Sequence, residues 1–425
     1  MKPATQGSRP LNYVEVVEQK RLNTAREQGI PWKKWGPYLS ERQWGTVRED
    51  YSADGNAWDY FSHDQSRSRV YHWGEDGMAG ISDDKQLLCF ALALWNGRDP
   101  ILKERMFGLT NSESNHGEDV KEYYFYIDST PTHSYMKYLY KYPQREYPYN
   151  DLVHTNRSRS RDEFEYELLD TGIFDDNRYF DVFVEYAKAD PEDLLIKVSV
   201  YNRGPEAAQI HVLPTLWFRN TWSWEEGERK PMLGQVSEGT IHASHPKLGE
   251  YTLECEGGPK LLFTENETNI KRLWGHANPS PYVKDGFHEY VVFGNANAVN
   301  PEKTGTKAAA HYVVNVAAGG SKVVRLRLSN KPRADTFAKF DQIFTERLAD
   351  ANEFYDRITP KNLSEDEKRV HRQALAGMLW SKQYYYFDLD KWLLEHNAHP
   401  ILGSKTRRSR NAEWFHMLNS DVISM

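Results

Sequence analysis

A block of aromatic and charged residues near the start of the chain is its clearest candidate for binding chemistry. The block covers residues 35–52, and a shorter one of similar composition covers residues 71–77. Charged side chains are almost never fully buried unless they are paired, so an apolar core has little use for this mixture. A sugar suits it, because sugar ring carbons stack on aromatic faces while the hydroxyl groups need charged and amide hydrogen-bond partners.

The residues predicted to contact a saccharide are Arg42, Trp44, Arg48, Glu49, Asp50, Trp73 and Asp76. The competing interpretation of the same residues is a network of salt bridges between domains, with tryptophans packed around it. Glu49 and Asp50 are adjacent, and adjacent residues on a strand point to opposite faces. We therefore do not expect these two carboxylates to form a catalytic pair.

Two acidic patterns are candidates for a metal site, and neither is predicted to bind one. Asp50, Ser52 and Asp54 begin like a calcium loop, but the twelfth position is Phe61 instead of the glutamate that completes the shell. The second pattern consists of His116, Glu118, Asp119 and Glu122. It lacks a recognised ligand spacing, so it is interpreted as a surface or domain-contact network.

Nine tyrosines gather within residues 122–149. Their amphipathic rings suit an interface with one wet and one apolar side. They are predicted to line either a sugar cleft or a seam with another domain, and the seam is favoured.

Length and composition set the broad class. The 425 residues are enough for two or three domains, and a net charge of -7 argues against a nucleic-acid partner, which would want a clustered basic face. Cys89 lies in an apolar run and Cys255 lies far from it, so buried thiols are predicted instead of a disulfide. The start of the chain lacks an apolar signal region, and no stretch reaches the roughly 18 apolar residues of a membrane helix. A cytoplasmic protein without a membrane partner is expected.

The elements that must position these residues are mainly strands. A helix is predicted over residues 11–28, and alternation of apolar and polar residues then recurs through residues 163–328, with turn signals between the alternating segments. Many strands without intervening helices predict an antiparallel sandwich. Helical spacing returns from residue 335, and a capping box at residues 364–367 predicts the start of a second helix.

Several of these segments resemble glycoside hydrolase family 63, in particular its mannosyl-oligosaccharide glucosidases and their bacterial, glucosidase-like branch. Residues 44–48, Trp-Gly-Thr-Val-Arg, are similar to the Trp-Gly-Thr-Tyr-Arg segment of those enzymes, and residues 71–77 are similar to the Tyr-x-Trp and Asp-Gly elements that follow it. The similarity continues in order through residues 117–124 and 216–224, and it spans most of residues 32–400.

The resemblance implies a division of the chain into four parts. These are an N-terminal helical segment (1–30), a large antiparallel β-supersandwich (31–330), a helical linker (331–362) and the first helices of an incomplete (α/α)6 catalytic barrel (363–425). Family members hydrolyse α-glucosidic bonds with inversion, which needs a carboxylic acid and a carboxylate roughly 6.5–9.5 Å apart. The family places the acid in a Trp-Asp-x-x-Phe motif and the base much later, and neither is found in this sequence.

The resemblance therefore predicts the amino-terminal part of an inverting glycosidase acting on α-glucosides or oligosaccharides, with no catalytic residue and no cofactor. Its expected partners are the carbohydrate substrate and the missing C-terminal barrel portion, and the fragment is expected to be inactive alone. A non-catalytic carbohydrate-binding or scaffolding β-sandwich is the alternative. A phosphorylase or debranching enzyme with the same plan is a third possibility.

Overall fold

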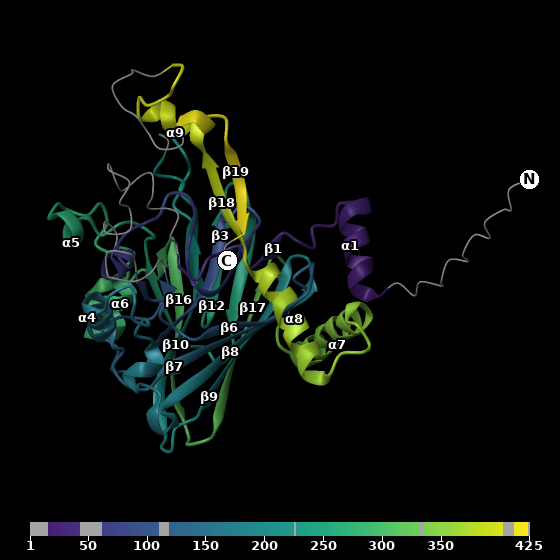
Figure 1. Ribbon diagram of the computed structural model, residues 1–425. Coiled ribbons are helices and arrows are strands. Elements are labelled where there is room, and N and C mark those ends of the chain that lie inside the picture. The colour runs from purple at the N-terminus through teal and green to yellow at the C-terminus, as the bar shows by residue number, and fades with distance from the viewer. Residues whose placement is uncertain are drawn as a thin grey trace, which may run out of the picture.

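The computed structural model describes residues 16–42, 62–109, 119–224, 227–331, 335–402 and 412–423. Two large antiparallel sheets pack face to face and are followed by helices (Figure 1). The predicted fold class, a mainly β chain with an antiparallel sandwich and a helical part after it, is confirmed.

The smaller sheet carries the candidate site on its outer face. Its six strands are, in order across the sheet, β1 (Trp35–Gly36), β2 (Met78–Asp83), β3 (Leu88–Trp95), β10 (Ala208–Phe218), β16 (Lys307–Val316) and β14 (Lys260–Thr264). Side chains alternate between the two faces of a strand. Along β10, Leu216 therefore enters the core while Thr215 and Trp217 point to the outer face.

The larger sheet covers the inner face of the smaller one. Its nine strands are, in order, β15 (Thr304–Gly305), β11 (Met232–Ser237), β12 (Thr240–His245), β13 (Gly249–Cys255), β17 (Ser321–Ser329), β9 (Asp193–Asn202), β8 (Tyr179–Asp190), β7 (Tyr135–Pro143) and β6 (Tyr124–Ser129). The inner faces of both sheets form one apolar core that includes Phe90, Ile196 and Leu326. Cys89 and Cys255 are both buried and unpaired, as predicted.

Short helices and loops cover the outer face of the smaller sheet. The helices of this region are α3 (His63–Ser66), α4 (Tyr149–Ser158), α5 (Ile270–Trp274) and α6 (Gly286–Phe293). The remaining short elements are the paired strands β4 (Gly108–Leu109) and β5 (Asp119–Val120) and the 3-10 segments Leu168–Thr171, Asp175–Asn177, Ala296–Ala298 and Ala412–Trp414. Helix α6 packs Phe287 and Val291 against Leu213 of β10 and Ala309 of β16. A small apolar core thus lies on the same face as the candidate site.

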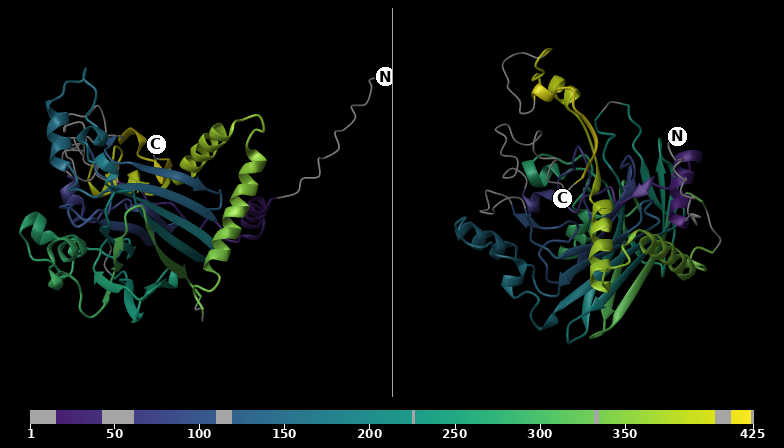
Figure 2. Two further views of the ribbon diagram at one scale, coloured as in Figure 1. Left: turned by 90° about the horizontal axis from the view of Figure 1, so that it is seen from below. Right: turned by 45° about the vertical axis from the view of Figure 1, so that its right-hand side comes forward.

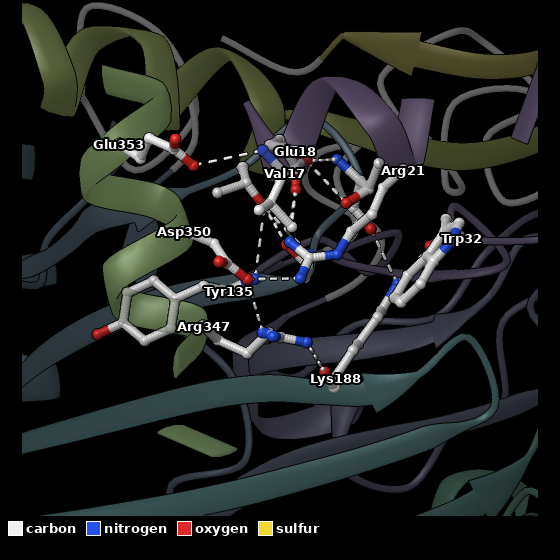
Figure 3. Close-up of polar contacts among 12 residues, drawn as sticks. Val17, Glu18, Arg21, Trp32, Tyr135, Lys188, Arg347, Asp350 and Glu353 are labelled. Atoms are coloured by element: carbon white, nitrogen blue, oxygen red, sulfur yellow. Dashed lines mark hydrogen bonds and ion pairs between the residues drawn. The ribbon is translucent and has the colours of Figure 1, made fainter. Parts of the chain in front are cut away.

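The N-terminal helix α1 (Val17–Gln28) packs on the linker helix α7 (Phe340–Ile358) and ends at Gly29, whose φ of 67° suits glycine. The buried Glu18 carboxylate accepts hydrogen bonds from the backbone N–H and hydroxyl of Thr132, both at 2.7 Å. Arg21 joins the same carboxylate to Asp350 of α7 (Figure 3). Buried charges therefore tie α1, α7 and the turn before β7 together.

Helix α8 (Glu365–Trp380) begins at the predicted capping box, in which Ser364 and Glu367 exchange side-chain and backbone hydrogen bonds. The next segment differs from the helical continuation that the resemblance predicts. It forms a hairpin of β18 (Lys382–Asp388) and β19 (Leu418–Ile423), with α9 (Leu389–Glu395) beyond β18. Aromatic residues favour strands, and here Phe387 of the hairpin packs on Trp73. Figure 2 (right) shows α8 and the hairpin as one column that extends beyond the sandwich. Among the described helices, none combines the length and apolar character needed to cross a membrane.

The interpretation of the tyrosine-rich segment as a seam or cleft is wrong for most of its rings. Five of them, Tyr135, Tyr138, Tyr140, Tyr142 and Tyr147, are buried in the interior of the folded chain. Buried tyrosine hydroxyls need partners, and buried carboxylates provide them. Tyr138 donates to Glu41 at 3.1 Å, and Tyr142 donates to Asp99 at 3.1 Å. The rings are therefore core residues with internally satisfied hydroxyls.

Glu41 gives this core a predicted pH dependence. Burial raises its pKa from 4.5 to about 8, despite the hydrogen bonds from Tyr138 and Tyr126. The folded chain holds this proton between those values while the unfolded chain releases it. The contribution of Glu41 to stability is therefore complete below pH 4.5 and is lost as the pH rises to about 8.

We expect Glu41→Gln, which keeps the side chain neutral, to flatten the pH dependence of stability. The wild type should lose on the order of 1.4 kcal/mol per pH unit more than the variant between pH 5 and 8. Urea unfolding at pH 5, 6.5 and 8 measures the difference. Glu395→Gln, at a site whose side chain is 53% exposed, is the control. Parallel profiles of the Glu41 variant and the wild type would contradict the raised pKa.

Candidate functional site

A small, strongly charged cavity lies on the outer face of the smaller sheet. Small side chains make room for it, since Ala91 and Ala93 of β3 and Thr215 of β10 form its floor. Its volume is about 20 Å³, which is enough to hold one water molecule. Its walls are Glu75, Asp76, Gly77, Glu104, Arg105, Trp217, Asn266, Lys284 and Lys307.

The segment 71–77 reaches the cavity because of a glycine. A Cβ atom on Gly77 would lie only 2.5 Å from the Cβ atom of Ala91. No other residue would let this backbone approach β3 so closely. The neighbouring Asp76 is thereby placed against Arg105, whose Nε lies 3.1 Å from Oδ1, and the hydroxyl of Tyr71 donates to the same carboxylate at 2.9 Å. All of these groups are buried.

A second buried ion pair forms the opposite wall. Lys307 of β16 donates to Glu104 at 2.6 Å. Lys284 donates to the backbone carbonyls of Ser66 and Arg69, and its ammonium lies 4.1 Å from the ring centroid of Tyr71. The wall thus joins three segments that are distant in the sequence.

Burial and neighbouring charges shift the pKa values of these groups in opposite directions. Burial alone would raise the pKa of Glu104, but Lys307 and Arg105 outweigh it and hold the value at about 2. Burial lowers the pKa of Lys284 to about 8, helped by the positive charge of Arg105. Burial raises the pKa of Glu75, although Lys284 opposes the shift. The cavity thus contains the ionised carboxylate of Glu104 and a lysine, Lys284, whose pKa is lowered toward neutral pH.

Charged side chains in a desolvated wall can bind and orient hydroxyl groups, because hydrogen bonds to charged groups are the stronger ones. Glu104 is held ionised by Lys307, and the carboxylate of Asp76 is held by Arg105. Neither arrangement is that of a carboxylic acid poised to donate a proton. Glu104 and Asp76 are therefore suited to recognition of polar groups and not to general acid catalysis.

Trp73 connects the site to the C-terminal hairpin. Its ring meets the ring of Phe387 at 4.8 Å and 89°, in a cluster that also contains Leu389 and Trp392. The adjacent His72 stacks on Trp224 at 4.3 Å with an angle of 4° between the rings. Segment 71–77 therefore contacts the hairpin through Trp73 and the charged cavity through Asp76.

Of the other predicted site residues, only Arg42 lies in the described part of the chain. It is half-buried, and its Nη1 lies 3.1 Å from Nδ1 of His63. Burial and then the charge of Arg42 lower the pKa of His63, which keeps that ring neutral and able to accept a hydrogen bond. Trp44, Arg48, Glu49 and Asp50, with the calcium-like residues 50–61, lie outside the described residues.

Sequence reasoning missed most of the cavity. The residues that it did not single out are Glu75, Glu104, Arg105, Lys284 and Lys307. One signal could have drawn attention to two of them, since Glu104 and Arg105 stand in a charged run between Leu102 and Met106, a context in which charges need partners. Lys284 and Lys307 carry no comparable local signal.

Asp119 of the predicted acidic pattern belongs to a salt-bridge cluster, as interpreted, whereas Glu122 is buried and pairs with Lys103 at 2.6 Å. Carboxylate oxygens of Asp119, Glu165 and Glu167 lie close enough together to hold a cation. The Lys121 ammonium already occupies that position, at 2.6–2.7 Å from all three. His116 and Glu118 lie outside the described residues.

Comparisons with known proteins place the chain beside one curated relative. No family model matches the sequence. The chain is 43% identical over 459 residues to the uncharacterized protein YMR196W of Saccharomyces cerevisiae. That alignment covers 96% of this chain and 42% of the relative, so the chain spans less than half of the length of the yeast protein.

Solved structures with a similar arrangement include proteins that are named for carbohydrate chemistry. A family GH92 α-mannosidase from Bacteroides thetaiotaomicron is 10% identical with a TM-score of 0.28, covering 76% of this chain and 38% of that one. A galactose mutarotase related enzyme from Lactobacillus acidophilus is 8% identical with a TM-score of 0.22. The match covers 60% of this chain and 95% of that enzyme. At such TM-scores neither likeness supports a conclusion about this chain.

Proposed function

We propose that this chain is the amino-terminal part of an inverting glycoside hydrolase that acts on α-glucosides or oligosaccharides in the cytoplasm. The acid and the base that cleave the bond belong to a helical portion outside these 425 residues. The sandwich provides part of the wall against which the saccharide binds. No cofactor takes part in this hydrolysis, because water attacks the sugar directly.

Segment 71–77 is the observation that carries the proposal. It belongs to the resemblance with family 63, and it gathers the two kinds of side chain that a sugar requires. Trp73 and His72 contribute aromatic rings on one side, and Asp76 lies in a charged cavity on the other.

The helical portion is proposed to pack on the column formed by α8 and the hairpin. Large apolar side chains are exposed there, with exposed fractions of 51–72% for Val370, Met378, Ile401, Leu402, Trp414 and Leu418. Large apolar side chains exposed on this column and at its tip support an interaction surface there. The yeast relative is more than twice as long as the aligned region, and its additional length is where the partner of this surface is proposed to lie.

The proposal is tested by incubating the full-length yeast relative with a panel of α-linked glucose disaccharides. We expect glucose release with inversion, so that the β-anomer appears first in proton NMR spectra, because an inverting pair delivers water to the opposite face of the sugar. The 425-residue chain is the matched control and should release none.

Three outcomes would contradict the proposal. Turnover by the 425-residue chain at an enzyme-like rate would show that it carries its own acid and base. Turnover that requires inorganic phosphate would favour a phosphorylase. Saccharide binding by the chain, without hydrolysis by the relative, would favour the non-catalytic binding protein.

A further inference from the structure

Arg219 is a buried cation without a hydrogen-bonded counter-charge. The residue follows β10 and is only 5% exposed. Neither Nε nor Nη1 of its guanidinium has a hydrogen-bond acceptor among the described residues. Its contacts are two aromatic rings, with the guanidinium carbon 5.1 Å from the ring centroid of Trp224 and 4.9 Å from that of Tyr384. Burying a charge is costly unless it is paired and hydrogen-bonded, so such a residue requires an explanation.

The neighbouring charges show that Arg219 is the exception. Arg105 is paired with Asp76, Lys307 is paired with Glu104, and Lys284 is held by backbone carbonyls. The charge of Arg219 acts on Glu75 and lowers the pKa of that acid, but neither Nε nor Nη1 of the guanidinium donates to it. Counting Arg219 with the described lining of the cavity, there are three acids, Glu75, Asp76 and Glu104, and four cations, Arg105, Arg219, Lys284 and Lys307. One positive charge is in excess when all of these groups are ionised.

Acceptor atoms without donors lie beside this cation. Asn220 and Asn266 are linked by a hydrogen bond from the Asn220 amide to the Asn266 carbonyl, at 2.9 Å. The Oδ1 atoms of both residues are buried and have no donor among the described residues. Oε2 of Glu104, on the cavity wall, is also buried and has no hydrogen-bond donor among the described residues. The cationic donors of Arg219 and the neutral amide acceptors of Asn220 and Asn266, which lack partners among the described residues, match a ligand that carries an anion together with hydroxyl groups.

We infer that Arg219 binds an oxyanion, either a carboxylate or a phosphate, on a hydroxylated ligand of the saccharide class. The planar guanidinium presents several donors in a fork that matches both anions. Hydroxyl groups of the ligand donate to Oδ1 of Asn220 and Asn266. The saccharide part of this inference rests on the proposed function, whereas the oxyanion part does not.

Two aromatic rings cover the guanidinium of Arg219. Trp224, which covers the guanidinium, is 41% exposed. Tyr384, on the other ring contact, belongs to the hairpin strand β18 and is half-buried. The ring that borders solvent is thus one that contacts the cation directly.

Calorimetric titration of the 425-residue chain with inorganic phosphate, glucuronate and glucose, at constant ionic strength, tests the inference. We expect a charged probe to bind about tenfold or more tightly than glucose, since a hydrogen bond to a charged group exceeds a neutral one by about this factor. Arg219→Met should weaken that binding by about tenfold or more, and Arg219→Lys should weaken it less. Arg178→Met, at a surface arginine paired with Glu206, should leave it unchanged. Binding of phosphate alone identifies a free or sugar-borne phosphate, and binding of glucuronate alone identifies an acidic sugar.

Thermal unfolding of the same variants separates binding from a structural role. An unpaired buried charge does not stabilise the fold, so Arg219→Met should unfold at the wild-type temperature or above it. A lower unfolding temperature for Arg219→Met, with wild-type affinity for the charged probe, would overturn the inference. So would the absence of binding by both charged probes. Because no bond is cleaved in this titration, it can fail while the yeast relative hydrolyses α-glucosides, and the reverse also holds.

Discussion

Replacement of Glu18 by alanine is expected to lower the free energy of unfolding by about 3–5 kcal/mol, which is the typical cost of removing one partner from a buried ion pair. Glu18 is fully buried and accepts hydrogen bonds from Thr132, Ser134 and Arg21. Without the carboxylate, the Arg21 guanidinium keeps Asp350 and the Ser134 hydroxyl but loses one of its two counter-charges, and the Thr132 N–H loses its acceptor. The substitution therefore weakens the neutralisation of a buried charge and leaves a backbone group unsatisfied.

Urea unfolding at pH 7 measures this loss. Glu27→Ala is the matched control, because Glu27 lies on the same helix but is 59% exposed and pairs only with the exposed Arg26 among the described residues. An exposed pair contributes little, so the control should change the free energy by less than about 0.5 kcal/mol. Equal losses for the two variants would show that the network around α1 does not fix α1 and α7 to the sandwich.

Replacement of Asp76 by alanine is expected to cost a similar amount, about 3–5 kcal/mol, because it leaves Arg105 buried without the carboxylate that neutralises it. Arg105 is only 5% exposed, and its Nε lies 3.1 Å and 3.2 Å from the two oxygens of Asp76. Burial alone would lower the pKa of Arg105, but Asp76, Tyr71 and Glu104 together outweigh it and raise the value. A guanidinium stays protonated in proteins even without its partner, so Arg105 cannot escape the cost by losing its proton.

A double variant makes this prediction specific. Asp76→Ala combined with Arg105→Met removes both charges, so it should recover much of the stability that the single variant loses. Asp176→Asn, at a 69% exposed position with two long ion pairs, is the control and should be nearly neutral, because asparagine tolerates the φ of 58° at this position. If the double variant were no more stable than the single one, the cost would come from lost packing and not from an uncompensated charge. Urea unfolding of the four proteins under one set of conditions measures the comparison.

The fold could be predicted largely from local patterns. Alternation of apolar and polar residues predicted the strands, and the box at Ser364 predicted the start of α8, because both signals depend on neighbours within a few residues. The tyrosine-rich segment was misinterpreted for a related reason. Its composition revealed amphipathic rings, but the buried acids that satisfy Tyr138 and Tyr142 come from residues 41 and 99. A sequence pattern does not show a partner so distant in the chain.

The sequence by itself determined the β class and the two helices after the sandwich. Only the tertiary structure decided that Asp76 meets Arg105, that Lys307 meets Glu104 across 203 residues of chain, and that Arg219 lies without a hydrogen-bonded counter-charge among the described residues. The physical reason is that strand formation depends on side-chain alternation along the chain, whereas the cost of a charge depends on what surrounds it in space. Segments brought together by sheet pairing create the charged cavity, and no single one of them contains it.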